Sequence, residues 1–145
     1  GDSYYGIKKF KIAFDYYEMS LALNPENFNL LNNYSYYLAI EKVNLKRAKE
    51  LILKVIDKFP DNSTYMDTYG WVMFQIGEYE EAEQILFNAV IKDGERSGEI
   101  LEHYGDVLFK LDNKKKAITF WKKAKATGEH SKELIQKINE NKIIE

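Results

Sequence analysis

None of the 145 residues is cysteine. The chain therefore forms no disulfide, offers no thiolate to a metal ion and has no thiol nucleophile. This absence does not separate a reducing compartment from an oxidising one. Proline is scarce as well, with two residues, Pro25 and Pro60. Because proline pushes the preceding residue out of the α region, each of them predicts the end of a helix.

An excess of charge of one sign is also missing, since 21 Lys and Arg residues face 23 Asp and Glu residues. The net charge of -2 gives no long-range field toward nucleic acid or an anionic membrane, and we expect neither as a partner. No run approaches the roughly 18 apolar residues of a membrane span, so we expect no direct membrane insertion. The chain begins with Gly1 and not with Met, which predicts a processed protein or a piece of a longer one.

The composition, 45% hydrophobic and 30% charged, is typical of one ordinary folded domain. Helical periodicity is clearest in residues 65–89. Four residues there share one face of a helix: Met66, Tyr69, Gly70 and Met73. After an interruption at Gly77, a second apolar stripe follows with Ala82, Leu86 and Ala89. Two helices joined by a short turn, whose apolar stripes must meet, form an antiparallel hairpin.

The hairpin pattern recurs at a fixed interval of 35 residues. Three sets of residues keep this interval: Tyr34, Tyr69 and Tyr104; Leu31, Met66 and Leu101; Ser35, Gly70 and Gly105. Such a period predicts hairpins that stack on one another. Small side chains at the contacts let paired helices approach to about 8–10 Å. No hairpin can bury its stripe alone, so each unit depends on its neighbours.

This arrangement resembles the tetratricopeptide repeat, a unit of about 34 residues with the pattern W-x-x-L-G-x-x-Y, then A-x-x-x-F, then P. Two copies match with conservative changes: Met66, Tyr69, Gly70, Met73, Ala82, Leu86 and Ala89, and Leu101, Tyr104, Gly105, Leu108, Ala117, Trp121 and Ala124. A looser copy and the second half of another precede them. The local sequences of these copies are similar to those of bacterial members of the family. The bacterial cytoplasm and the cell envelope both stay open as locations.

The resemblance implies an all-α fold, a right-handed superhelix of about 3.5 hairpins closed by a C-terminal capping helix. We expect one domain, with a half repeat at 1–26, repeats at 27–61, 62–95 and 96–129, and the capping helix at 130–145. Asn44 and Ser97 are predicted N-caps, because their side chains can accept from free backbone N–H groups. The half repeat lacks a partner for its helix, residues 7–23. We therefore expect an exposed apolar patch there, and either self-association through it or contact with residues upstream of this sequence.

In the family, the first helix of each unit lines a concave groove that holds a peptide or a partner helix. The resemblance thus implies a protein-binding scaffold, with no catalytic activity, cofactor or metal. The groove residues that it implies are Asn29, Asn32, Asn33, Tyr36, Thr64, Asp67, Thr68, Trp71, Phe74, Gln75, Glu99, Glu102, His103, Asp106 and Phe109. Because few of these positions are basic, we do not expect a clamp for a C-terminal carboxylate.

We expect instead a partner segment with Lys or Arg and an apolar anchor. Carboxylates such as Asp67 and Asp106 would accept charge-assisted hydrogen bonds, and Trp71 or Phe74 would hold the anchor. The simpler alternative is that Asp67, Glu102 and Asp106 form only a solvated face of the helices.

Other functions stay open on the sequence alone. An RNA-binding helical repeat would need basic grooves, and the acidic inner helices argue against it. A docking segment of a larger enzyme is a further alternative. Four residues of one helix have the spacing of metal ligands, although a solvated surface explains them more simply: Glu99, Glu102, His103 and Asp106. His103 with Asp67 could form an acid/base pair, but no nucleophile or glycine-rich loop accompanies them.

Overall fold

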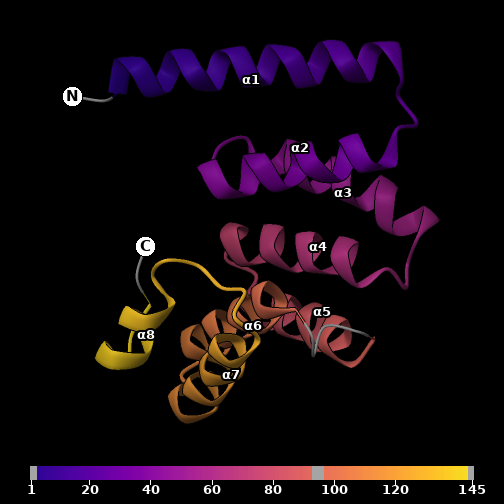
Figure 1. The fold of residues 1–145 in the computed structure, drawn as a ribbon. Helices are drawn as coiled ribbons and strands as arrows, with labels where there is room; N and C mark the ends of the chain where they lie inside the picture. The colour runs from indigo at the N-terminus through magenta and orange to yellow at the C-terminus, as the bar shows by residue number, and fades with distance from the viewer. Residues whose placement is uncertain (1–2, 93–96, 144–145) are drawn as a thin grey trace.

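The computed structural model describes residues 3–92 and 97–143, and every regular element in these ranges is a helix. The helices are α1 (Ser3–Leu23), α2 (Phe28–Glu41), α3 (Leu45–Lys58), α4 (Ser63–Ile76), α5 (Tyr79–Lys92), α6 (Gly98–Lys110), α7 (Lys114–Thr127) and α8 (Leu134–Glu140). They form a right-handed solenoid of stacked hairpins, with α1 at one end and α6 and α7 at the other (Figure 1). None of the described helices is both long enough and apolar enough to span a bilayer.

The first helix of each full hairpin begins with the same device. The side chains of Asn27, Asn62 and Ser97 cap α2, α4 and α6, and each accepts a hydrogen bond from the backbone N–H three residues later, at 3.1, 3.1 and 3.3 Å. These caps keep the interval of 35 residues. Ser97 is confirmed as a cap, whereas the two asparagines went unrecognised in the sequence.

Three local predictions differ from the structure. Asn44 lies at the N-cap of α3, but its backbone is left-handed (φ 46°) and its side chain makes no cap hydrogen bond, so that prediction was wrong. Helix α1 begins at Ser3, several residues before the expected start. Helix α8 covers only Leu134–Glu140, because Ser131 and its neighbours are used in contacts with α6.

Close approach of the paired helices requires small residues at their crossings. A Cβ added at Gly70 would lie 2.6 Å from Cγ of Leu86, and one added at Gly105 would lie 2.4 Å from Cδ1 of Trp121. In the α2–α3 pair the equivalent position is Ser35, whose hydroxyl donates to the Ala48 carbonyl at 2.7 Å. The serine therefore replaces the glycine without leaving a buried polar atom unsatisfied.

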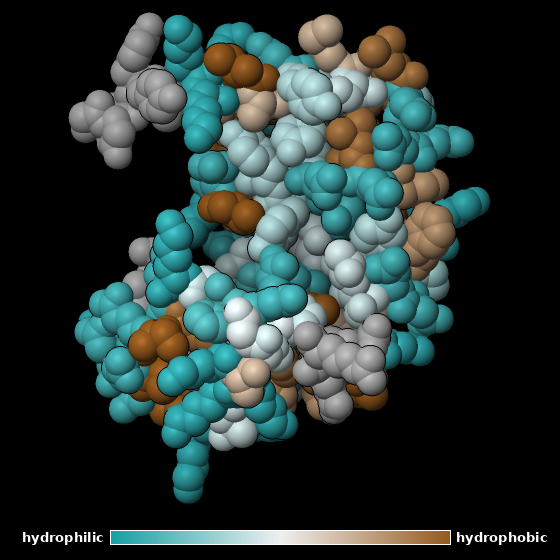
Figure 2. Space-filling view, viewed as in Figure 1, coloured by the Kyte–Doolittle hydropathy of each residue, from teal (hydrophilic) through white to brown (hydrophobic). Residues whose placement is uncertain are grey.

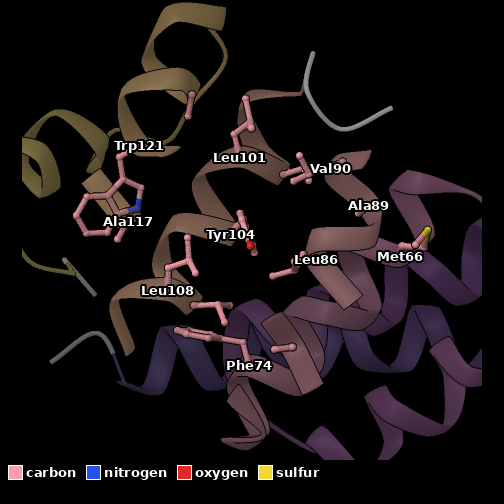
Figure 3. Packing of buried hydrophobic residues seen from close by; sticks show 14 of the residues in the cluster. Met66, Phe74, Leu86, Ala89, Val90, Leu101, Tyr104, Leu108, Ala117 and Trp121 are labelled. Atoms are coloured by element: carbon pink, nitrogen blue, oxygen red, sulfur yellow. The ribbon is translucent and has the colours of Figure 1, made fainter. Parts of the chain in front are cut away.

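The core has two parts along the solenoid. One packs α1, α2 and α3, together with Val72 of α4, around Tyr34, Leu38 and Ile52. The other packs α4 to α8, with Leu86, Tyr104 and Trp121 among its buried members (Figure 3). Ile56, Tyr69 and Trp71 are partly buried against both parts, so they connect them.

Candidate protein-binding groove

A cavity of about 330 Å³ lies where α2, α4 and α6 face α8. On this flank the molecular surface is hollowed between α8 and the N-terminal half (Figure 2). The cavity is lined by Tyr36, Ile40, Lys42, Trp71, Phe74, Gln75, Glu102, His103, Asp106, Ser131, Glu133, Lys137 and Ile143.

The structure brings together only part of the set of groove residues expected from the sequence. Those that line the cavity are Tyr36, Trp71, Phe74, Gln75, Glu102, His103 and Asp106. The others belong to the same three helices but are outside the cavity lining: Asn29, Asn32, Asn33, Thr64, Asp67, Thr68, Glu99 and Phe109. Sequence reasoning missed Ile40 and Lys42 at the end of α2, and everything that α8 and its flanks contribute.

One wall of the cavity is a stack of rings from two helices. Trp71 and Phe74 of α4 are stacked with centroids 4.6 Å apart and planes 11° apart. The imidazole of His103, from α6, stacks on Trp71 at 4.0 Å. Ile40, which is exposed, and Ile143 add aliphatic surface at the rim. This wall is apolar except for the imidazole edge, whereas Gln75, Glu133 and Lys137 are among the polar residues in the rest of the lining.

The acidic residues of this surface contact the chain's own cations. Asp67 Oδ1 is 2.8 Å from Nδ1 of His103. The buried ammonium of Lys137, on α8, lies 2.7 Å from Oε2 of Glu102 and 3.0 Å from both carboxylate oxygens of Asp106. The simpler alternative, a solvated acidic face, is wrong for Asp67, Glu102 and Asp106, because all three are buried.

Further hydrogen-bond donors contact the carboxylates of Glu102 and Asp106. The backbone N–H of Ser131 donates to Glu102 at 2.8 Å, and the Ser131 hydroxyl donates to the same group. The indole N–H of Trp121 donates to Asp106 at 3.0 Å. Glu102 and Asp106 thus each accept three hydrogen bonds from α7, α8 and the segment between them, out of about four that a carboxylate can accept. Little capacity is left for a Lys or Arg of a partner.

Neighbouring charges shift the pKa values of these groups. Burial raises the pKa of Glu102, but the hydrogen bonds from Lys137 and Ser131 outweigh it and the pKa falls below its usual range. Burial lowers the pKa of Lys137, but Asp106 and Glu102 raise it by more, so the pKa lies above its usual range. Burial also lowers the pKa of His103, but the charge of Asp67 and its hydrogen bond outweigh burial, so the pKa is raised. Both shifts favour the charged forms of Lys137 and His103. For Asp106 burial prevails, and its pKa is raised although Lys137 and His103 lower it.

The side chains that lie close enough to hold a cation are not the set that the sequence spacing indicates. Ligand atoms of Asp67, Glu99 and His103 all lie within 4.8 Å of one another. Each already has a protein partner, since Asp67 and His103 contact each other and Glu99 accepts from the Tyr36 hydroxyl. Glu102 and Asp106, the other members of the expected set, are bound by Lys137.

Comparisons with known proteins agree on the fold. No model of a known protein family matches the chain. A TPR repeat-containing protein of Pseudomonas aeruginosa is 31% identical over 86 residues, which are 59% of this chain and 14% of that protein. The chain thus spans a small part of that relative's length.

Three solved structures illustrate the likeness. A thermophilic TPR protein of Thermus thermophilus has a TM-score of 0.76 and 19% identity, over 96% of this chain and 76% of that one. MamA of Desulfovibrio magneticus, from residue 41 to its end, has a TM-score of 0.69 and 19% identity, over 85% and 68%. The Sgt2 TPR domain of Aspergillus fumigatus has a TM-score of 0.68 and 17% identity, over 80% and 77%.

Proposed function

We propose that this chain, a tetratricopeptide-repeat array, is a non-enzymatic scaffold that binds a peptide or helix of another protein in its concave groove. Stacked helical repeats of this kind produce extended concave surfaces suited to binding. The single observation that carries the proposal is the ring stack of Trp71, Phe74 and His103 at the cavity between α2, α4, α6 and α8.

The cavity favours an apolar anchor on the partner. A volume of about 330 Å³ is at the lower end for ligand pockets, which suits one or two large side chains and not an extended small molecule. Aromatic walls of this kind form the energetic centre of many interfaces, where a few buried contacts supply most of the affinity. A Leu, Met or Phe of an amphipathic helix can fill this space with its neighbours on the rim.

In this proposal, charged residues of the partner bind at the rim of the groove. Asp67 and Asp106 are occupied within the chain, so they hold the groove together and do not contact the partner. Glu133 is exposed and lines the cavity, which leaves its carboxylate available to a Lys or Arg beside the anchor. An exposed pair of this kind contributes at most about 1 kcal/mol. The anchor therefore dominates the affinity.

The proposal is tested by selecting from a displayed random-peptide library on the 145-residue chain. We expect selected peptides to share an aromatic or aliphatic anchor near a basic residue. Ile40→Asp should weaken their binding at least about tenfold, because it places a charge at the rim of an apolar site. Ile40 is exposed, so this variant keeps the fold. Ile91→Asp, at an exposed position on α5 outside the cavity lining, is the matched control.

Two outcomes would reject the proposal. Selected peptides that bind Ile40→Asp as tightly as the unmodified chain would place the interaction elsewhere. Binding of single-stranded oligonucleotides with an affinity that falls steeply with salt would favour the RNA-binding alternative.

A further inference from the structure

Helix α1 has two apolar faces, and only one of them is packed. Phe14 and Tyr17 contact Tyr34 of α2, with ring centroids 6.2 and 4.7 Å apart. On the opposite side, four large side chains are exposed to solvent: Ile12 (62%), Tyr16 (64%), Met19 (67%) and Leu23 (86%). They share one face because residues three and four apart are neighbours on a helix. We call these four residues the α1 stripe.

We propose that the α1 stripe pairs with the α1 stripe of a second copy of this chain, the two helices running antiparallel about a two-fold axis. The spacing of the stripe is four, three and four residues, which reads the same in both directions. Such a surface is self-complementary under a two-fold rotation. It is also the alternation that forms a two-helix seam.

The symmetry fixes which residues meet. With the axis halfway along the stripe, Ile12 packs against Leu23 of the second copy, and Tyr16 packs against Met19 of the second copy. Each contact occurs twice. Every member of the stripe then has a partner, and none projects into solvent.

Charges beside the stripe favour the antiparallel direction. Lys8 and Lys9 are exposed at its N-terminal end, and Glu26 is exposed just beyond its C-terminal end. Antiparallel pairing brings Lys9 near Glu26 of the second copy, at both ends of the interface. Parallel pairing would place the lysines of both copies together. Lys11 and Asp15 form a pair within the helix at 3.2 Å and oppose neither arrangement.

The area involved predicts a weak, reversible dimer. Four side chains per copy bury less than the roughly 800 Å² per partner of a standard stable interface. Dimerisation nevertheless goes beyond the proposed groove function, because one assembly would then carry two grooves. A partner with two binding segments would gain avidity from the second groove without any new contact.

The first test measures the mass of the 145-residue chain by analytical ultracentrifugation at about 10 μM to 1 mM, the range of weak association. The monomer has a mass of 17.0 kDa, and we expect the weight-average mass to rise toward twice that value. Ile12→Asp should remain monomeric throughout. Ile91→Asp is the matched control, since Ile91 is 61% exposed against 62% for Ile12, and it should behave as the unmodified chain.

The second test determines the register. Because the chain has no cysteine, Ile12→Cys and Leu23→Cys proteins can be mixed and oxidised without competing thiols. Antiparallel pairing predicts mainly the mixed disulfide, since only those two positions come within bonding distance. Mainly Ile12→Cys homodimers would indicate parallel helices and overturn the proposal. A strict monomer at 1 mM, or equal loss of association in Ile91→Asp, would overturn it as well.

Discussion

His103 shows how one residue of the groove combines structural and electrostatic roles. Its ring is buried, stacks on Trp71 and contacts Asp67 of the preceding hairpin. Asp67 raises the pKa of the imidazole although burial lowers it. A group whose pKa rises on folding stabilises the folded state most below its unfolded pKa, about 6.5. That contribution is lost as the pH rises through the folded value.

We therefore expect the free energy of unfolding to decrease as the pH rises above about 6.5, by no more than about 1.4 kcal/mol per pH unit for this one proton. Urea unfolding between pH 6 and 8.5 measures the slope. Asp67→Asn should reduce it, because the imidazolium loses its partner. His130→Gln alters the other, exposed histidine and should keep it. An unchanged slope in Asp67→Asn would show that the pair does not control the titration.

At the scale of one element, α8 is short and held by few residues. Leu134 is fully buried, and the Lys137 ammonium reaches Glu102 and Asp106 of α6. Lys137 follows Glu102 by the repeat interval of 35 residues, so α8 occupies the place of a further first helix. It thereby forms one side of the groove and caps the core.

Lys137→Met should destabilise the chain by about 3–5 kcal/mol, because it leaves two buried carboxylates without a cation. The loss should be smaller near pH 5, where these carboxylates can take up protons. Hydrogen exchange should show the amides of α8 losing protection before those of α2 and α3. Lys142→Met, at an exposed ion pair, is the control and should cost little. A loss below about 1 kcal/mol for Lys137→Met would mean that α8 is held by its apolar contacts, Leu134 and Ile138, and not by the ion pair.

At the scale of the whole molecule, the two parts of the core make stability a local property. Leu38 belongs to the N-terminal part and Leu108 to the C-terminal part, and both are buried. In stacked repeats each unit contacts only its neighbours, so damage to one part reaches the other through few residues. Here those include Ile56, Tyr69 and Trp71, together with α4 itself, which contributes Val72 to the N-terminal part and Met73 to the C-terminal part.

Leu38→Ala and Leu108→Ala should each cost about 2–5 kcal/mol, as truncations of buried leucines do. The two variants should change hydrogen exchange in different parts of the molecule. Leu38→Ala should accelerate exchange in α2 and α3 while α6 and α7 keep their protection, and Leu108→Ala should do the reverse. Uniform acceleration in both variants would instead indicate a single cooperative core.

The sequence by itself determined the repeat, the helices and the paired packing. These follow from local physics: the spacing of Leu31, Met66 and Leu101, a cap at Ser97, and glycines at positions where Leu86 and Trp121 leave no room for a Cβ. Local signals cannot say which way a helix is rotated against distant ones. Only the tertiary structure decided that Lys137 neutralises Glu102 and Asp106, 35 and 31 residues away. Pairing of charges depends on side chains that meet across helices, and it buries carboxylates that the sequence predicted to be open to a partner.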